Sequence, residues 1–289
     1  MIVCPDCGIE LQEEGPRLEC PGCSFCAHRR DGILFFPVEN VTGDFEDYKA
    51  DWLDRLYKYE QDHFWFKNRR RFIRRIFNKY VDKKERILEI GAGTGSVSRM
   101  LAENGYCPEL GEIHLKGLQY AAQYGLNRLY RFDTRKAPFK EEFDTVCMFD
   151  VLEHIEDDGL VLRNIHRMLK KEGKLILTVP AHRFLWSGID EASGHKRRYE
   201  LKELKSKLMD NGFDIVDAGH FFTFLLPFLY IRTLLNRKET RPLEDMDTGL
   251  RINRLFNLFF NGLSVMEYYL FAGFSPGFGG SIIIVGRKQ

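Results

Sequence analysis

The sequence predicts an α/β protein whose main domain is a doubly wound, mostly parallel sheet of seven strands. Three observations support this expectation. Strand-like and helix-like segments alternate from about residue 86 to residue 220. The first of these strands is short and apolar, and a glycine-rich turn follows it at once. With 289 residues, of which 44% are hydrophobic and 29% charged, the chain is long enough for one large α/β domain and a small appendage.

The order of these segments gives the expected elements. Short apolar runs predict buried strands, and the segments between them carry apolar residues at helical spacing. The expected strands span 86–90, 107–113, 128–132, 143–149, 173–179, 213–219 and 281–286. The expected helices span 95–104, 116–124, 157–170 and 200–211, preceded by helical sequence over 41–80.

Composition divides the chain into four parts and limits its partners. These are a cysteine-rich segment at 1–40, the α/β core at 41–220, a hydrophobic insertion at 221–275 and the last core strand at 276–289. The formal net charge of +1 gives no global reason to expect nucleic acid or an anionic membrane as a partner. Cys4 lies where the apolar region of a signal peptide would begin, so we expect cytoplasmic residence.

Two C-x-x-C pairs dominate the cysteine-rich segment. Cys4 and Cys7 form one pair, Cys20 and Cys23 form the other, and twelve residues separate them. This spacing is typical of a tetrahedral thiolate site with a hairpin between the pairs, so we predict a zinc ribbon that binds Zn²⁺. Two disulfides are the alternative, which a cytoplasmic location disfavours. The segment holds three arginines against seven acidic residues, which favours a structural or protein-docking role over phosphate binding.

A glycine-rich turn follows the first core strand. Gly91, Gly93 and Gly95 stand between that strand and a helical segment. Glycine is needed where the backbone takes positive φ or a ligand approaches closely, and the helix N-terminus offers free N–H groups. This predicts a site for a nucleotide-like ligand, with Glu89 beside it. The G-x-G-x-G spacing differs from both the dinucleotide fingerprint and the P-loop.

Four ordered motifs over roughly residues 60–220 narrow the identity of that ligand. The first, Glu89-Ile-Gly-Ala-Gly-Thr-Gly95, resembles motif I of the class I S-adenosylmethionine (SAM)-dependent methyltransferases, in the branch related to the type-11 and type-12 domain families. The resemblance implies a Rossmann-like core in which this turn holds the amino acid part of SAM. The residues so implied are Glu89, Gly91, Ala92, Gly93, Thr94 and Gly95.

The same resemblance implies partners for the nucleoside of SAM. Glu112, at the end of the second strand and followed by Ile113, is expected to accept hydrogen bonds from the ribose hydroxyls, with Glu109 as the fallback. The segment after the third strand is similar to the family's third motif. It implies that Asp133 accepts from the adenine amino group, with Thr134 beside it.

The fourth motif and a segment before the core complete this part of the resemblance. Phe143-Asp-Thr-Val-Cys-Met-Phe-Asp-Val-Leu-Glu-His-Ile155 resembles motif IV, which implies that Phe149, Asp150, Val151 and Leu152 flank the methionine arm of SAM and that Asp150 and His154 face the cleft. For Asp150, a role as a helix N-cap stays open. Before the core, His63-Phe-Trp-Phe-Lys-Asn-Arg-Arg-Arg71 resembles a helix that closes over SAM. Arg69 is therefore expected to pair with the SAM carboxylate, and the other arginines up to residue 75 to form a solvated face.

The loop after the fifth strand is unusually rich in polar and aromatic residues. Residues 179–199 resemble the P-A-H-x-x-L-W-S-x-x-D-x-x-x-G-H-x-R-R-Y signature of the same branch, at the carboxyl edge where open sheets bind ligands. Methyl transfer to oxygen or nitrogen often needs a proton removed, and His195 is the first candidate base, ahead of His154 and Asp190. A purely loop-pinning role for His195 remains the alternative. For Trp186 and Tyr199, packing is favoured over substrate contact.

The insertion at 221–275 is expected to form a helical cap over the cleft. Its first eleven residues lack any charge, and 255–274 is again rich in aromatic residues. Neither stretch reaches the ~20 apolar residues that a membrane-spanning helix needs. Such a cap suits a hydrophobic acceptor, a homodimer contact or peripheral membrane contact.

These features predict a SAM-dependent methyltransferase with structural Zn²⁺. Its acceptor would be a small molecule, a glycan or a lipid-linked compound that offers an oxygen or nitrogen nucleophile. A methyltransferase for rRNA or tRNA bases is an alternative, against which the near-neutral charge and the acidic cysteine segment argue. A non-enzymatic alternative is a partner protein with the same fold that docks other proteins through its zinc ribbon.

Overall fold

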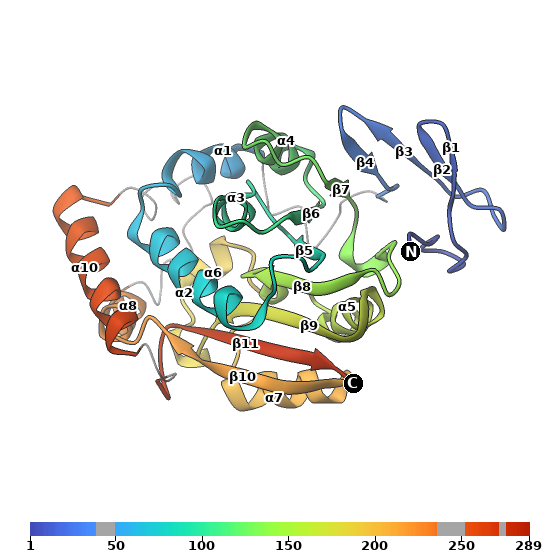
Figure 1. Ribbon diagram of the computed structural model, residues 1–289. Helices are drawn as coiled ribbons and strands as arrows, with labels where there is room; N and C mark the ends of the chain where they lie inside the picture. The colour runs from blue at the N-terminus through green and yellow to red at the C-terminus, as the bar shows by residue number, and fades with distance from the viewer. Residues whose placement is uncertain (39–49, 236–251, 272–275) are drawn as a thin grey trace.

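The computed structural model describes residues 1–38, 50–235, 252–271 and 276–289. The expected helical stretch at 41–49 and the parts of the cap at 236–251 and 272–275 lie outside the described residues. Within them, one sheet of eleven strands runs in the order β1-β2-β3-β4-β7-β6-β5-β8-β9-β11-β10 (Figure 1). The last seven strands of this order form the predicted core.

Six of the seven core strands run parallel, and the seventh is inserted in the opposite direction. The first core strand in the sequence, β5, lies at the centre between β6 and β8, whereas β11 pairs antiparallel with both β9 and β10. The strands are β5 (Ile87–Ile90), β6 (Pro108–Glu112), β7 (Leu129–Arg131), β8 (Phe143–Phe149), β9 (Leu169–Pro180), β10 (Phe213–Phe221) and β11 (Ser281–Lys288). This arrangement confirms the predicted fold class.

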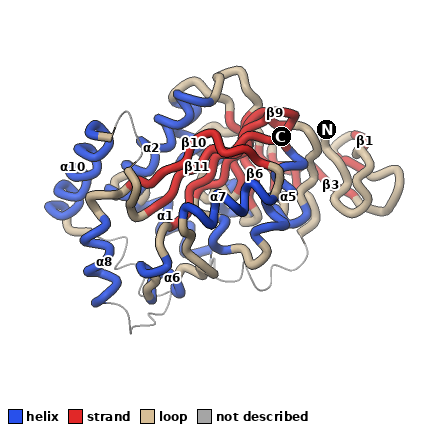
Figure 2. Tube along the Cα trace, turned by 90° about the horizontal axis from the view of Figure 1, so that it is seen from below, coloured by secondary structure: helices blue, strands red, loops and turns tan. Residues whose placement is uncertain are grey.

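Helices cover both faces of the core sheet (Figure 2). Those of the core and its N-terminal extension are α1 (Ala50–Tyr59), α2 (Phe64–Tyr80), α3 (Ser96–Glu103), α4 (Leu115–Gln123), α5 (Asp158–Met168), α6 (Gly188–Ala192) and α7 (Leu201–Asp210). Three short 3₁₀ turns are η1 (Thr134–Lys136), η2 (Leu152–His154) and η3 (Arg183–Leu185). Because the elements follow the predicted alternation, the carboxyl ends of the parallel strands meet at one edge, as a doubly wound sheet requires.

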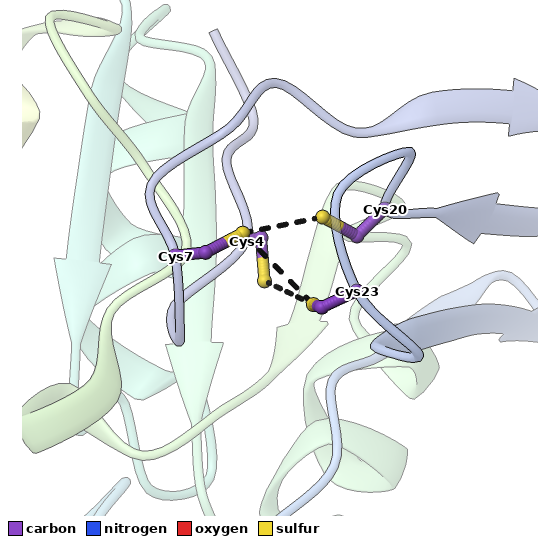
Figure 3. A group of neighbouring side chains, drawn as sticks. All are labelled: Cys4, Cys7, Cys20 and Cys23. Carbon is purple, nitrogen blue, oxygen red and sulfur yellow. Dashed lines mark hydrogen bonds between the residues drawn. The ribbon is translucent and has the colours of Figure 1, made fainter.

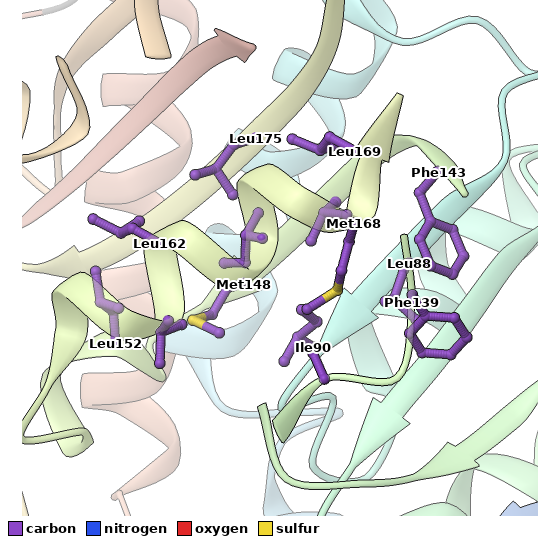
Figure 4. Packing of buried hydrophobic residues seen from close by; sticks show 14 of the residues in the cluster. Leu88, Ile90, Phe139, Phe143, Met148, Leu152, Leu162, Met168, Leu169 and Leu175 are labelled. Atoms are coloured by element: carbon purple, nitrogen blue, oxygen red, sulfur yellow. The ribbon is translucent and has the colours of Figure 1, made fainter. Parts of the chain in front are cut away.

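Alternation along the strands divides the core into two apolar layers. Leu88 and Ile90 pack on one side of the sheet with Met168 of α5, as Figure 4 shows. Ile87 points to the other side, where it packs in a cluster with Phe77 of α2. Successive strand residues face opposite sides of a sheet, so a continuous apolar strand is buried on both. This explains why the central strands lack a polar face.

The largest differences from the predicted element boundaries lie around β9 and at the end of β10. Helix α5 ends at Met168 and β9 begins at Leu169, where we expected helix up to residue 170 and strand only from residue 173. The residues between the two expected elements form an irregular part of the strand pairing: Phe143 of β8 pairs with Leu169, and the register shifts before Thr145 pairs with Lys174. Strand β10 continues through Phe221, so the cap begins later than its expected first residue.

The cysteine-rich segment is joined to the core sheet. Its strands are β1 (Gln12–Glu14), β2 (Arg17–Glu19), β3 (Cys26–Arg30) and β4 (Ile33–Phe35). They form an antiparallel meander, and β4 pairs in parallel with the edge strand β7. The side chains of Cys4, Leu34 and Phe36 are buried in the same apolar cluster as Phe132 and Phe139 of the core. The segment therefore extends both the sheet and the hydrophobic core.

The described part of the cap consists of α8 (Leu226–Leu235) and α10 (Arg254–Leu270). Helix α10 packs along α2, at the end of the molecule opposite the cysteine-rich segment (Figure 1). Among the described residues, none of the helices combines the length and the apolar character that crossing a bilayer requires.

Candidate active site

One large cavity lies at the carboxyl ends of the central strands. Its volume is about 800 Å³, and its wall draws on α1, α2, the turns after β5, β6 and β8, the loop after β9, and both cap helices. The predicted site residues on this wall are Arg69, Glu89, Gly91, Ala92, Gly93, Thr94, Glu112, Ile113, Thr134, Phe149, Asp150, Val151, His154, Asp190 and His195. Segments far apart in the sequence thus meet at the edge where open α/β sheets bind ligands.

The three glycines of the turn serve different purposes. All three have positive φ, at 67° for Gly91, 54° for Gly93 and 79° for Gly95. A Cβ atom on Gly91 would lie 2.5 Å from the side chain of Val151, so this position has no room for a side chain. At Gly93 the nearest atom would be 4.0 Å away, and its backbone borders the cavity. Gly95 begins α3 and packs against helix α4, outside the cavity wall.

Glu112 holds the glycine turn from the neighbouring strand. Its carboxylate accepts a hydrogen bond from the backbone N–H of Gly93 at 2.8 Å and another from that of His114 at 2.9 Å. The fallback residue Glu109 is buried elsewhere, where it accepts hydrogen bonds from Arg86 at 2.6 Å and from Tyr130 at 2.6 Å. The register of β6 therefore brings Glu112 to the cavity and keeps Glu109 away from it.

The segment after β7 contributes Thr134 to the cavity wall but turns Asp133 aside. The Asp133 carboxylate accepts hydrogen bonds from the guanidinium of Arg135 at 2.9 to 3.2 Å, and another from the Arg135 backbone N–H at 2.8 Å. It thereby caps the short turn η1. The structure does not bring this carboxylate to the cavity wall, which is formed here by Phe132 and Thr134.

An ion pair lies beside the glycine turn. Arg69 of α2 donates to Asp150, which also accepts from the Thr178 hydroxyl at 3.0 Å. Asp150 adopts a φ of 55°, which is costly for a residue with a side chain, and it caps no helix. Deep burial raises the pKa of the nearby Glu89 to about 7, although a hydrogen bond from Ser98 opposes the shift. An arginine and two carboxylates thus line one end of the cavity.

His195 and Asp190 form a hydrogen-bonded pair under the cap. The Nδ1 atom of His195 lies 2.9 Å from Asp190, whose carboxylate also accepts from Arg198 at 2.8 Å and from the Ser187 backbone at 2.9 Å. Burial acts to raise the pKa of Asp190, but the hydrogen bonds and the charge of Arg198 outweigh it and lower that pKa to about 2. The carboxylate is therefore ionised near neutral pH and orients the imidazole.

Two more titratable groups face His195. The Nε2 atom of His195 lies 4.0 Å from Glu153, and the ring of His154 stands edge-on to the His195 ring at a centroid distance of 4.7 Å. Burial, reinforced by the charge of Asp150, raises the pKa of Glu153 well above its usual range, whereas burial lowers the pKa of His154 to about 3. Glu153, His154 and His195 each offer one atom that could ligate a metal, and these atoms lie within 4.8 Å of one another. Such a set is able to hold a divalent cation.

With this geometry described, the comparisons with known proteins identify the family. A profile of the methyltransferase domain matches residues 57–218. The chain belongs to this methyltransferase family. It is a SAM-dependent methyltransferase, which confirms the resemblance to class I enzymes.

Curated relatives match this methyltransferase over a short stretch. Ubiquinone biosynthesis O-methyltransferases of Pseudomonas fluorescens (strain Pf0-1) and Xanthomonas oryzae pv. oryzae (strain PXO99A) are 31% and 32% identical to it over 101 residues. Each alignment covers 32% of this chain, and they cover 44% and 42% of the relatives. The chain thus spans less than half the length of the curated relatives it matches, so their substrate does not pass to it directly.

Solved structures share its fold over most of its length. Haemonchus contortus phosphoethanolamine N-methyltransferase 2 in complex with SAM aligns with a TM-score of 0.56 and 18% identity, over 85% of this chain and 59% of that one. A chain of the complex between the Haloferax volcanii Trm112 methyltransferase activator and a methyltransferase aligns with a TM-score of 0.55 and 16% identity, over 83% and 95% of the two chains. Such identities indicate a common fold alone.

The methyltransferase also gathers the four predicted metal ligands in one place. The sulfur atoms of Cys4, Cys7, Cys20 and Cys23 lie within 4.8 Å of one another, and Figure 3 shows them converging from two loops. Hydrogen-bonded pairs of these sulfurs are 3.3 to 3.9 Å apart. Tetrahedral Zn²⁺ at ~2.3 Å from each sulfur would separate them by about 3.8 Å, so the cluster fits this metal. All four cysteines are free thiols here, not disulfides.

Two aromatic side chains of the loop have structural partners, as expected, whereas the arginines of α2 depart from expectation. Tyr199 is fully buried and donates to Asp158 at 2.8 Å, and Trp186 donates to Glu191 at 3.2 Å. The arginines after Arg69 do not form a solvated face. Arg71 donates to Asn261 at 3.1 Å and Arg75 to the Phe271 carbonyl at 3.1 Å, and both contacts fasten α10 to α2.

The candidate list omitted several charged residues of the cavity wall, among them Glu60, Glu153 and Arg198. Glu60 is buried at the end of α1 and accepts from the Thr94 hydroxyl, but an acidic residue within a helical pattern gives no sequence signal. Glu153 and Arg198 stand inside the motifs that resemble the family, next to the predicted His154 and within the basic triplet that follows His195. Their positions in the motifs were the signal that would have found them.

Proposed function

We propose that the methyltransferase transfers a methyl group to an oxygen or nitrogen atom of a small amphipathic acceptor. The observation that supports this most is the Asp190–His195 pair, which lies on the same cavity wall as the glycine turn. The remaining wall near this pair is largely apolar and comes from α8 and α10. The O-methyltransferases among the relatives act in ubiquinone biosynthesis, which favours oxygen as the nucleophile.

SAM, when bound, supplies the methyl group as an electrophile on its sulfonium. The residues of this chain fit such a ligand: the Gly93 backbone borders the cavity without a side chain, and Glu112 retains acceptor capacity for two hydroxyl groups. Arg69 presents a cation for the carboxylate of SAM, and Glu89 an anion for its ammonium group. Thr134 borders the cavity where the resemblance places the adenine.

His195 serves as the general base in this proposal. Because its Nδ1–H donates to the ionised Asp190, its Nε2 atom is left as the proton acceptor on the cavity side. His154, whose pKa is about 3, stays neutral near pH 7 and is suited to orienting the acceptor. The polar end of the cavity would thus remove a proton from the acceptor and hold its nucleophilic atom in line with the methyl group.

Cys4, Cys7, Cys20 and Cys23 are proposed to bind structural Zn²⁺. Cys4 and Cys20 lie in the core cluster, which supports a structural role over docking of a separate protein. Cytoplasmic residence is part of the same proposal, since thiolate ligands persist in a reducing compartment.

Calorimetric titration with SAM and with S-adenosylhomocysteine tests the first half of the proposal. Both ligands should bind the wild-type protein, and Glu112→Ala should weaken binding at least tenfold because it removes the proposed ribose acceptor and the support of the Gly93 amide. Unchanged affinity in Glu112→Ala would exclude our cofactor assignment.

Turnover of a panel of phenolic, carboxylic and amine acceptors tests the second half. His195→Gln should bind SAM as the wild type does and lose about a hundredfold in kcat, since general-base catalysis contributes 10²–10⁴. Ser206→Ala, on an outer face of α7, is the matched control. A His195→Gln enzyme of normal kcat would mean that this histidine only fastens its loop.

A further inference from the structure

Helix α10 has its polar face turned inward. Asn257 accepts from the Phe64 backbone N–H at 2.8 Å, and Asn261 accepts from Asn68 at 3.2 Å. Ser264 and Glu267 are fully buried, and Glu267 accepts from the Phe224 backbone N–H at 3.0 Å. A helix on the surface of a globular protein normally turns such side chains toward water. Here Asn257, Asn261 and Glu267 fasten the helix to the body of the enzyme.

The outer face of α10 is apolar along its whole length. Seven large apolar side chains, between 48% and 76% exposed, occupy it: Leu255, Phe256, Leu258, Phe259, Met266, Tyr269 and Leu270. At ~100° per residue they cover an arc of about 160°. Helix α8 lies beside it, joined through the contact between Phe228 and Phe260, and adds Phe228, Tyr230, Ile231, Leu234 and Leu235 to the exposed set. We call these twelve side chains the α8–α10 face.

The charges at this face do not favour either sign. Arg254 is exposed at the start of α10, but Arg232 of α8 lines the cavity, and the exposed Asp62 lies beside α10, where its backbone carbonyl accepts from Asn257 at 3.0 Å. An inward polar face and a wide apolar outer face are the features of a helix that lies in the interface of a bilayer. With 17 residues, α10 would extend ~26 Å along such a surface.

The cavity reaches this same face. Phe228, Ile231 and Leu235 are exposed and also line the cavity, so its edge lies among the apolar side chains of the α8–α10 face. A rigid protein pressed onto the face would cover that edge. A fluid bilayer would leave it open to an acceptor with an apolar tail, and this step rests on the proposed function.

We infer that the α8–α10 face binds the surface of a phospholipid bilayer, with α10 parallel to the membrane plane. The enzyme would then take an amphipathic acceptor directly from the lipid phase, its polar end toward His195. Binding depends on apolar insertion, which salt does not screen.

Flotation with vesicles tests the inference without any acceptor. The full chain, loaded with zinc, should float with phosphatidylcholine–phosphatidylglycerol vesicles and remain bound in 0.5 M NaCl. Leu255→Gln combined with Leu258→Gln should weaken vesicle binding more than tenfold, because both side chains lie exposed on the α8–α10 face. The matched control is Met209→Gln with Val216→Gln, which removes two exposed apolar side chains far from the cap.

SAM calorimetry on the same proteins separates this inference from the proposed function. Normal SAM affinity in both double variants shows that the fold is intact, and loss of vesicle binding in the Leu255/Leu258 variant alone supports the inference. Failure of the wild type to float overturns it, as does an equal loss in the control variant. A concentration-dependent dimer in sedimentation velocity that these two substitutions abolish, without vesicle binding, assigns the face to a second copy instead.

Discussion

The two appendages of this methyltransferase are attached in opposite ways. The cysteine-rich segment joins the core through backbone pairing of β4 with β7 and through side chains shared with the main apolar cluster. The α8–α10 pair joins through side-chain contacts to α2 and keeps twelve large apolar side chains exposed. One appendage completes the core, and the other presents a surface.

The position of each appendage suggests what it supports. The cysteine-rich segment contacts residues 131–140, since Phe36 N–H donates to the Arg131 carbonyl at 2.9 Å and Val3 N–H to the Pro138 carbonyl at 2.8 Å. That stretch carries Thr134, which lines the cavity where we propose that the cofactor binds. The cap lines the part that we propose for the acceptor. Damage to the first should therefore affect stability and SAM binding together, and damage to the second should spare both.

Loss of a cysteine ligand should give the largest effect. Cys4→Ser should release the metal, lower the free energy of unfolding by about 3 kcal/mol or more and lower Tm by roughly 10 °C, because Cys4 is buried in the core cluster. SAM affinity should fall in parallel. Zinc content, differential scanning calorimetry and SAM titration measure the three quantities.

Cys26→Ser is the matched control, because Cys26 lies in β3 but outside the group of four sulfurs. It should keep zinc, Tm and SAM affinity. A Cys4→Ser protein that lacks zinc but melts and binds SAM like the wild type would contradict the comparison, since the segment would then be a separable domain.

Local sequence patterns were sufficient for the core but not for the join between segment and core. Apolar strands such as Ile87–Ile90, and the turn after this strand, can be recognised in the sequence, because burial and positive φ restrict which residue types can occur there. Strands β4 and β7 are three residues each and lie almost a hundred residues apart, so their pairing leaves no periodic signal. The metal ligands were predicted; their incorporation in the sheet was not.

Partners that the sequence does not reveal decide where several of the predicted polar side chains lie. Asp133 carries the residue type that the resemblance requires, yet Arg135, two positions later, takes its carboxylate. Arg71 and Arg75 alternate with apolar residues as on a solvated helix, but tertiary partners on α10 occupy them. Motifs specify which residue types are present, and only packing decides which partner each one finds.

The pH dependence of SAM binding should report on the core alone and so distinguish it from the two appendages. Burial raises the pKa of Glu89 from its model-compound value of 4.5 to about 7, so the folded protein keeps this proton between those values. Ionisation of the buried Glu89 carboxyl therefore lowers the free energy of unfolding as pH rises through about 7. In our proposal, the ammonium group of SAM pairs with this ionised carboxylate. Between pH 5.5 and 7.0, SAM affinity should rise roughly tenfold, as more of Glu89 ionises.

Glu89→Gln should bind SAM weakly and with little pH dependence over this range in calorimetric titrations. The cap variant Leu255→Gln with Leu258→Gln should retain the full dependence, since both side chains are exposed on α10. A dependence that survives in Glu89→Gln would assign the titration to another group.

The smallest effect should come from loosening the cap. The guanidinium of Arg75 stacks on the ring of Tyr268 at 3.6 Å from its centroid and donates to backbone carbonyls at the end of α10. Arg75→Met should remove these contacts, at a local cost of about 1.4 kcal/mol, and speed amide exchange in α10 roughly tenfold. Tm should change by less than about 3 °C, because the main core is untouched.

The control Arg74→Met, on the same helix, should leave exchange in α10 unchanged. A loss of global stability in Arg75→Met as large as that in Cys4→Ser would mean that the cap is as much a part of the folding core as the cysteine-rich segment, and that the two appendages differ in their surfaces alone.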